Sequence, residues 1–348
     1  MIKCCKGETM SEYVTAEKLY PLKFQPVYVE RIWGGTLMSE HLNRELPEHN
    51  APIGESWEIS DRAGAESVVV NGELAGLTLP QLIKFYGRGL LGESCRDISR
   101  FPLLVKLIDA GERLSLQVHP DDNACRESGD GAEPKTEMWY VISAKSGAKI
   151  LAGLSEKATR HHLRELIASP DVERLLQIYP SQAGDAYYIP SGTLHAIGAG
   201  NLILEIQQNS DTTYRVSDWG RVDANGNSRE LHVEQGIKAI NFMNRKSPRI
   251  AGAVDKVKRN RKYDIVTVCP YFNVADLRLV ETRMDDTKQR SFHLLSAINS
   301  AFTVVCQNGT EPVVVERGET VMIPAAVGSY RIEVSANADE CVIVKTML

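Results

Sequence analysis

Short apolar runs with strand character recur along the chain between turn residues. They predict strands over residues 56–60, 67–70, 103–108, 138–143, 186–190 and 202–207. Apolar residues at helical spacing predict helices over 79–91 and over 158–179, the second interrupted at Ser169-Pro170. The pattern therefore predicts a mainly β protein with helices at its periphery.

The composition changes after Phe242, where a basic stretch over 244–262 has the character of a linker. No aromatic residue interleaves with its charges before Tyr263, so we read it as a solvated connector and not as a nucleic-acid site. Strand-like runs return over 272–279, 302–307, 313–315, 320–324, 329–334 and 341–345. We predict a flexible N-terminal extension (1–17), a main domain with helical insertions (18–243), the basic linker (244–262) and a smaller C-terminal β-barrel (263–348).

Charge and composition narrow the class of function. The chain has 348 residues, is 43% hydrophobic and carries a net charge of -5, which gives no general attraction to nucleic acid or to an anionic membrane. Its seven cysteines are scattered and form no CxxC pair, as expected in a reducing compartment. No apolar stretch reaches the roughly 18 residues of a membrane helix. We expect a cytoplasmic protein; the sequence does not determine its oligomeric state.

Three segments combine polar residues that could hold a metal ion. Ser115, Gln117 and His119 alternate along one predicted strand, so their side chains share a face. Glu137 shares a face with Lys135 by the same rule, and a turn after residue 190 presents His195. Imidazole nitrogens and a carboxylate are ligands that zinc accepts, with a position left for water or substrate.

His119, Glu137 and His195 suit such a site, although any one of these histidines taken alone is more often a hydrogen-bonded structural residue than a metal ligand. Gln117 could add a neutral oxygen, although an amide is an uncommon zinc ligand. The C-terminal barrel is expected to be free of metal, because its corresponding turn over 318–329 carries no histidine.

The same segments resemble the two motifs of the cupin superfamily. Gly184, Pro190, Gly192 and His195 match the second motif, whereas Gln117 stands where the first motif usually has a histidine. The resemblance implies a cupin barrel, a jelly-roll or double-stranded β-helix, followed here by a second, smaller cupin-like barrel. Cupins host many unrelated activities, so the fold alone does not give the function.

A narrower resemblance is carried by several motifs in order along the chain. They are Arg31-Ile32-Trp33-Gly34-Gly35, Gly54-Glu55-Ser56-Trp57-Glu58, Gln117-Val118-His119-Pro120-Asp121, Lys135-Thr136-Glu137-Met138-Trp139-Tyr140 and Thr213-Tyr214-Arg215. Together they resemble type I mannose-6-phosphate isomerase, in its compact bacterial branch. The resemblance implies interconversion of mannose 6-phosphate and fructose 6-phosphate and an active site that contains Arg215. It also implies one Zn²⁺ per chain, held by Gln117, His119, Glu137 and His195.

Such an isomerisation moves a proton between adjacent carbons through an enediol. Lys135 is the first candidate for this step, since desolvation and a nearby cation would lower its pKa, although it could instead simply pair with an acidic residue. Glu205 and Asp211 are further candidates, and which group is the base stays open. Arg215, Ser115 and Lys106 are expected to bind the small sugar phosphate.

Two other functions are compatible with the metal residues. An iron-dependent cupin oxygenase would also use histidine and carboxylate ligands, but Gln117 and the Thr-Tyr-Arg loop argue against it. A non-catalytic sugar-binding cupin is disfavoured because Lys135 and Arg215 accompany the ligands.

Overall fold

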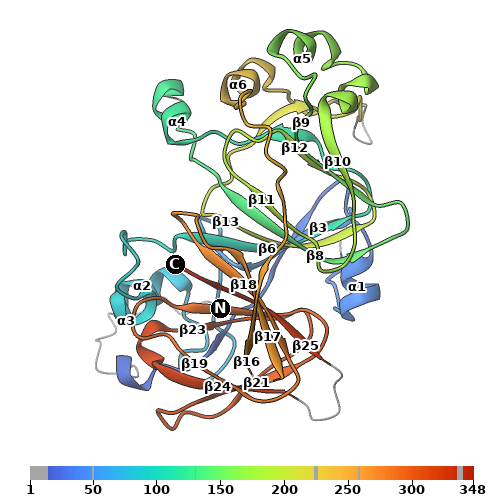
Figure 1. Ribbon diagram of the computed structural model, residues 1–348. Coiled ribbons are helices and arrows are strands. Elements are labelled where there is room, and N and C mark those ends of the chain that lie inside the picture. Colours follow the sequence, from blue (N-terminus) through green and yellow to red (C-terminus); the bar gives the residue numbers. More distant parts are fainter. Residues whose placement is uncertain (1–14, 49–50, 130, 223–225, 258, 335–339) are drawn as a thin grey trace. The chain divides into compact units, whose positions relative to one another are not determined.

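The computed structural model describes residues 15–48, 51–129, 131–222, 226–257, 259–334 and 340–348. These residues form antiparallel sheets with short helices (Figure 1), so the prediction of a mainly β protein is confirmed. They divide into two compact units. The first unit comprises Pro26–Glu58 and Leu103–Ala251, and the second comprises residues 15–25, Ile59–Pro102 and Gly252–Leu348. The domain limits predicted from the sequence, 18–243 and 263–348, stay a prediction.

The first unit contains a large antiparallel sheet in the order β15-β11-β8-β13-β6-β3-β2. Its strands are β2 (Val27–Glu30), β3 (Ile53–Ile59), β6 (Leu103–Ala110), β8 (Glu137–Ala144), β11 (Ala186–Ile189), β13 (Asn201–Gln208) and β15 (Arg249–Ile250). Strand β6 is almost uninterruptedly apolar, and every one of its residues is buried. Such a run is expected where both faces of a strand are covered.

A second sheet of the same unit has the order β10-β9-β12-β7-β14. Its strands are β7 (Leu116–Val118), β9 (Lys149–Leu154), β10 (Leu176–Pro180), β12 (His195–Ile197) and β14 (Tyr214–Ser217). Ile108 and Ile203 of the first sheet pack in one buried cluster with Ile150 and Ile197 of the second. The two sheets therefore enclose a common core.

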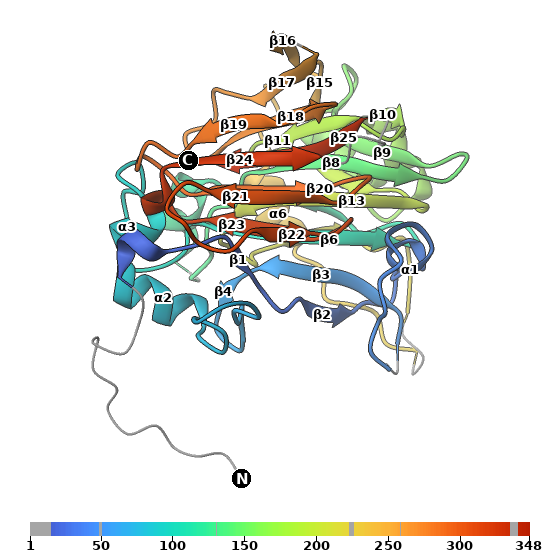
Figure 2. The ribbon, with the colours of Figure 1, turned by 90° about the horizontal axis from the view of Figure 1, so that it is seen from below.

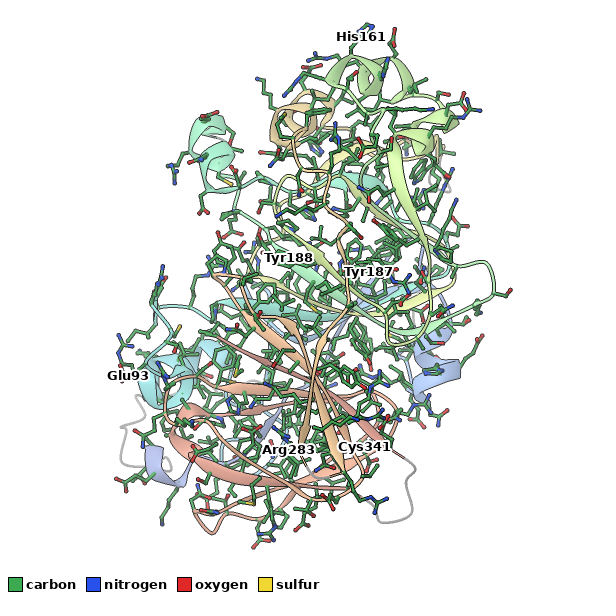
Figure 3. All side chains as sticks on the ribbon, in the orientation of Figure 1. Glu93, His161, Tyr187, Tyr188, Arg283 and Cys341 are labelled. Carbon is green, nitrogen blue, oxygen red and sulfur yellow. The ribbon has the colours of Figure 1, made fainter. Side chains whose placement is uncertain are left out.

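Helices α5 (Arg160–Leu166) and α6 (Val233–Ala239) and the 3-10 helix η3 (Pro170–Leu175) pack against the second sheet (Figure 1). The first unit also contains α1 (Leu37–Leu42), which contacts β13 of the large sheet, and α4 (Asp122–Ser128). The helix predicted over 158–179 is thus only partly correct. Helix α5 ends at Leu166, and Pro170 is the first residue of η3. The residues after η3 join the sheet as β10. His161 points outward from α5 (Figure 3).

The second unit has a sheet in the order β1-β23-β20-β25-β18-β17-β16 (Figure 2) and another in the order β19-β24-β21-β22. The strands are β1 (Leu22–Lys23), β16 (Ala253–Val257), β17 (Asn260–Val266), β18 (Asn273–Leu279), β19 (Arg283–Asp286), β20 (His293–Ala297), β21 (Phe302–Cys306), β22 (Val313–Val315), β23 (Thr320–Ile323), β24 (Ser329–Val334) and β25 (Cys341–Met347). Most were predicted from the sequence. Strands β16 and β17 lie largely inside the range expected to be a linker.

Shorter elements complete the second unit. They are β4 (Asp61–Arg62), β5 (Ala65–Glu66), α2 (Leu79–Tyr86), α3 (Arg88–Leu91) and the 3-10 helices η2 (Ala16–Lys18) and η4 (Ala325–Val327). The helix predicted over 79–91 is present but divided at Gly87, whose φ of 46° interrupts the helical geometry. Residues 67–70 form only isolated bridges where a strand was predicted. Among the described residues, no helix has the length and apolar character needed to cross a membrane.

Candidate active site

Strand β7 brings together residues that are far apart in the sequence. Gln117 pairs directly with His195 of β12 on one side and with Arg215 of β14 on the other. Direct cross-strand partners share a face of a sheet. One row across the second sheet therefore contains a predicted metal ligand, the amide beside it and the arginine expected in the active site.

The large sheet carries a matching row. Glu205 of β13 pairs with Lys106 of β6 on one side and with Trp139 of β8 on the other. The indole Nε1 of Trp139 donates to Glu205 Oε1 at 3.0 Å. Strand β3 follows β6 in this sheet, and its Glu55 lies 3.6 Å from the Lys106 ammonium. Charged groups are thus arranged side by side on buried strands.

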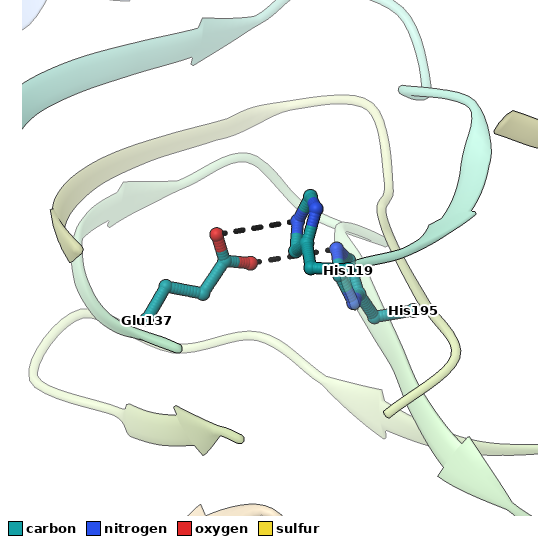
Figure 4. Close-up of side chains that lie close together, drawn as sticks. All are labelled: His119, Glu137 and His195. Atoms are coloured by element: carbon teal, nitrogen blue, oxygen red, sulfur yellow. Dashed lines mark ion pairs between the residues drawn. The ribbon is translucent and has the colours of Figure 1, made fainter. Parts of the chain in front are cut away.

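His119, Glu137 and His195 form a buried cluster in this unit (Figure 4). The Nε2 atom of His119 lies 3.5 Å from one oxygen of Glu137, and Nε2 of His195 lies 3.4 Å from the other. All three potential ligand atoms are within 4.8 Å of one another. The structure therefore brings together the three residues that the sequence singled out as metal ligands.

Backbone carbonyls orient both imidazoles. His119 Nδ1 lies 2.8 Å from Thr212 O, and His195 Nδ1 lies 2.9 Å from Thr193 O. A carbonyl only accepts, so each Nδ1 carries the proton and each Nε2 is unprotonated, with a lone pair that can bind a metal ion. Burial lowers the pKa of His195 to about 3 and, together with the Lys135 charge, lowers the pKa of His119. Both rings are neutral near pH 7, as a metal ligand must be.

A glycine turn joins the two histidine segments. The backbone N–H of Gly192 donates to His119 O at 2.9 Å. Gly192 has a φ of 82°, and a Cβ there would lie 3.1 Å from Ala239 O. Glycine is the residue that adopts this φ without strain, so the turn that presents His195 depends on it.

The cluster has the dimensions of a zinc site. Two ligands bound to a tetrahedral zinc at about 2.0–2.1 Å lie roughly 3.3 Å apart, close to the separations between Glu137 and the two imidazoles. His119 Nε2 is also buried without a hydrogen-bond partner among the described residues. An unsatisfied buried nitrogen is costly unless something binds it, so the residues present fit a bound metal ion.

Gln117 lies next to this cluster without completing it. Its amide nitrogen is 3.3 Å from His195 Nε2, and its oxygen accepts from Ser115 Oγ at 3.1 Å. Ligation by Gln117 would require the amide oxygen in the place of the nitrogen. Its part as a ligand stays a prediction.

The expected pKa shift of Lys135 is wrong in direction. Its ammonium lies 2.9 Å from Glu137 Oε2, and both side chains are buried. Burial alone would lower the pKa of Lys135, but the Glu137 carboxylate raises it above its usual value. Burial would likewise raise the pKa of Glu137, but the Lys135 charge helps to hold it well below its usual range. The ion pair outweighs desolvation in both groups.

A pocket of about 490 Å³ opens beside the cluster. The residues predicted for catalysis and substrate binding all line it: Lys106, Ser115, Lys135, Glu205, Asp211 and Arg215. Gln117 lines it as well and connects it to His195. The proximity predicted from separate motifs is therefore present, whereas the role of each residue stays a prediction.

Further residues of the pocket were not predicted. They include Glu30, Arg31, Trp33, Glu55, Arg229 and His232. Arg31, Trp33 and Glu55 belong to motifs that carried the family resemblance, so a signal for them was present. Arg229 and His232 follow residues 223–225, which lie outside the described residues, and no motif marked them.

Arg215 lies at a corner of the pocket that is rich in positive charge. Its terminal nitrogen donates to Glu230 O at 2.9 Å, while its Nε is buried without a hydrogen-bond partner among the described residues. Burial and the neighbouring Arg229 lower the pKa of Arg215. Asp218, a possible partner for it, instead accepts hydrogen bonds from Arg221 and Arg229. Arg215 therefore has unused capacity to bind an anion.

The surroundings of Glu205 in the pocket strongly change its ionisation. Burial raises its pKa to about 7, and the neighbouring Lys135 and Lys106 only partly oppose that effect. Glu55, which is also buried, differs, because the charges of Lys106 and Arg31 lower its pKa to about 2. The two carboxyl groups beside Lys106 thus have opposite preferences for a proton.

Comparison with known proteins supports the interpretation of these motifs. Residues 21–140 match the family model described as "Phosphomannose isomerase type I, catalytic domain". The chain is 36% identical over 327 residues to mannose-6-phosphate isomerase ManA of Bacillus subtilis, covering 93% of this chain and 98% of that protein. It is also 36% identical over 327 residues to mannose-6-phosphate isomerase of Streptococcus mutans, covering 92% and 99%.

The fold agrees with these sequence matches. The crystal structure of the mannose 6-phosphate isomerase from Bacillus subtilis superposes with a TM-score of 0.83 and 32% identity, covering 94% of this chain and 99% of that one. The resemblance inferred from the motifs is confirmed, and the chain belongs to the type I mannose-6-phosphate isomerase family, close to its compact Bacillus branch.

Proposed function

We propose that this chain is a zinc-dependent isomerase that interconverts mannose 6-phosphate and fructose 6-phosphate through an enediol. The observation that carries the proposal is the buried cluster of His119, Glu137 and His195, in which the unprotonated Nε2 atoms of both imidazoles face one carboxylate. A pocket with charged walls adjoins it. Relatives that match nearly the whole chain are named mannose-6-phosphate isomerases.

His119, Glu137 and His195 would hold one zinc ion, with Gln117 as a further ligand. When bound, zinc would supply a Lewis acid that stabilises negative charge on a substrate oxygen. Thr212 and Thr193 support this arrangement by fixing the imidazole tautomers through their carbonyls. Such supporting hydrogen bonds commonly set the affinity of a metal site.

Lys135, Glu205 and Asp211 line the pocket and are the candidates for moving the proton between C1 and C2 of the sugar. The Trp139 indole fixes one Glu205 oxygen, leaving the other directed toward Lys106. Lys135 forms an ion pair with Glu137 and also lines the pocket. Its ammonium group therefore lies between the metal cluster and the pocket. A group in this step must be within hydrogen-bond reach of the substrate carbon's proton.

The arginine corner of the pocket suits the phosphate group. Arg215 and Arg229 line it, and Asp218 is the carboxylate that partly balances them. A guanidinium provides planar, paired donors that match phosphate oxygens. Ser115 and Lys106 also line the pocket and could bind the sugar hydroxyls or the phosphate.

We also infer that the two facing sheets of the first unit form the cupin barrel implied by the motifs. The shared core of β6, β8, β9, β12 and β13 supports this inference. We infer that the two sheets of the second unit form the second barrel. They are the seven-stranded sheet that contains β20 and β25 and the four-stranded sheet that contains β21 and β24.

The test is a metal-reconstituted assay. Purified protein is stripped with a chelator, reloaded with Zn²⁺ or Fe²⁺, and supplied with mannose 6-phosphate, with glucose 6-phosphate as the matched control. Formation of fructose 6-phosphate is followed through phosphoglucose isomerase and glucose-6-phosphate dehydrogenase, and the glucose 6-phosphate arm is read by direct detection of fructose 6-phosphate. We expect turnover of mannose 6-phosphate that depends on the metal.

The same samples test the alternatives. Binding of sugar phosphate without turnover in any metal form would favour a non-catalytic sugar-binding cupin. Oxygen consumption by the Fe²⁺ form with no isomerisation by the Zn²⁺ form would favour an oxygenase. Either result would overturn the proposed function.

A further inference from the structure

Lys106 carries a buried positive charge on the floor of the pocket. Its side chain is 5% exposed, and its Nζ lies 3.6 Å from Glu55 Oε2 and 3.7 Å from Glu205 Oε2. The ammonium also lies 5.0 Å from the centre of the Trp57 ring. Burying an ammonium costs several kcal/mol unless opposite charges or an aromatic face compensate it.

The two carboxylates hold this ammonium without forming short hydrogen bonds to it. Distances of 3.6 and 3.7 Å exceed the usual range of an N–H···O hydrogen bond. The charge is therefore compensated electrostatically, while the donors of Lys106 stay available to a ligand in the pocket that it lines. Such an arrangement is suited to binding a hydroxyl or an anion.

Glu55 is fixed much more firmly than this single contact requires. Arg31 donates to both of its oxygens, at 2.9 and 3.4 Å, and Trp57 Nε1 donates to Oε2 at 2.7 Å. Trp57 thus contacts Lys106 with its ring and Glu55 with its N–H. The carboxylate has little freedom to approach Lys106 and form a short bond.

Glu205, on the other side of Lys106, has other interactions. One of its oxygens accepts from Trp139, and the nearby charges of Lys135 and Glu137 also act on it. Glu55 lies away from the metal cluster, on β3, and its interactions belong to Arg31, Trp57 and Lys106. Of the two carboxylates, Glu55 is thus the one that faces Lys106 from a fixed position outside the metal cluster.

We propose that Glu55 is the positioning residue of Lys106: it keeps the ammonium at the pocket floor at a distance that leaves its donors free for the sugar phosphate. This inference rests on the proposed isomerase function for its substrate, but the coupling between the two residues can be measured independently of turnover. Trp57 assists by fixing Glu55 and covering the ammonium.

The test is a double-mutant cycle with Glu55→Gln, Lys106→Met and the combined variant. Glutamine keeps an oxygen for the Trp57 N–H but loses the charge that faces Lys106. Misplacing a group by about 1 Å can cost about 100-fold in rate, so we expect Glu55→Gln to lower kcat/KM by that order. In the Lys106→Met background it should change kcat/KM by less than about twofold, because the group that it positions is absent.

Binding gives a second readout. Isothermal calorimetry with sorbitol 6-phosphate, which has no carbonyl and cannot isomerise, should show the same non-additivity in Kd. Glu156→Gln is the matched control, because it removes one charge from an exposed residue of the same unit. We expect it to leave kcat/KM and Kd unchanged.

Trp57→Phe is a second variant, for the case in which Glu55→Gln does not fold. It keeps an aromatic ring beside Lys106 and the charge of Glu55 but removes the N–H that fixes Glu55. It should give a smaller loss that also disappears in the Lys106→Met background. Additive effects of Glu55 and Lys106 in both kcat/KM and Kd would overturn the inference and assign Glu55 to a structural pair with Arg31. An inactive wild-type protein that still shows the coupling in Kd would overturn the isomerase function and leave the positioning role intact.

Discussion

Replacing Arg215 by lysine separates a substrate-binding role from a structural one. Lysine keeps the positive charge but loses the planar guanidinium. Its single ammonium group cannot both donate to Glu230 O and bind an anion in the pocket as Arg215 can. Donors aimed at charge in a water-poor site each contribute about 10²–10³-fold in rate. We therefore expect kcat/KM for mannose 6-phosphate to fall by roughly 100-fold or more.

The effect on stability should be small by comparison. One lost hydrogen bond costs about 1 kcal/mol, and the repulsion from the neighbouring arginines is unchanged because lysine carries the same charge. In a domain of about 150–250 residues, the size range of the first unit, a loss of 1 kcal/mol lowers Tm by about 2–4 °C. Zinc content should not change, because Arg215 lies beside Gln117 and outside the cluster of His119, Glu137 and His195.

The measurements are coupled-assay kinetics, zinc by elemental analysis and Tm by scanning calorimetry, each made on the same preparation. Arg164→Lys is the matched control, since Arg164 forms an exposed ion pair with Glu234. Such pairs are worth about 0–1 kcal/mol, so this variant should behave as wild type. Near-normal turnover by Arg215→Lys would make Arg215 a structural residue and refute its placement in the active site.

Three further predictions follow from the metal cluster and from a buried acid. His195→Ala should lose most zinc and activity together, and Gln117→Ala should lose less zinc because three ligands stay in place; a fully loaded, active His195→Ala would exclude the site. Elemental analysis should give one zinc per chain, and a metal bound by residues 263–348 in a crystal would contradict this. Burial raises the pKa of Asp109 from 3.8 to about 6, so stability is lost as the pH rises through that range. We compare the free energies of unfolding of Asp109→Asn and wild type by chemical denaturation. The difference in favour of Asp109→Asn should be about 1 kcal/mol larger at pH 7.5 than at pH 5, and an equal difference at both pH values would argue against the raised pKa.

Much of the strand pattern could be predicted because buried strands need apolar residues. The runs over 103–108, 138–143 and 202–207 became the adjacent central strands β6, β8 and β13. The apolar pattern over 158–179 was less informative. The positions of Leu175, Leu176 and Ile178 fit one face of a helix, but they also fit a strand with an irregular register, which is what they form. Only pairing with β9 makes β10 the stable choice for this segment, and that partner is not visible locally.

The metal cluster was predictable for a different reason. His119, Glu137 and His195 each lie in a short motif, and these motifs occur along the chain in the family order. The shift of the Lys135 pKa was not predictable from spacing alone, since the face shared with Glu137 allowed both desolvation and pairing. The 2.9 Å contact decides in favour of pairing.

The row that holds Lys106 shows where local sequence stops being informative. Lys106 is 51 positions from Glu55 and 99 from Glu205, differences read directly from their numbers. A lysine within an apolar strand signals a buried charge, which requires compensation, but the sequence does not say by which carboxylate. Register supplies the answer: Glu205 faces Lys106 across β13 and β6, and β3 brings Glu55 to the other side. A slip of one residue in β6 would turn Lys106 to the opposite face, so the register of this sheet determines whether the pocket has its ammonium at all.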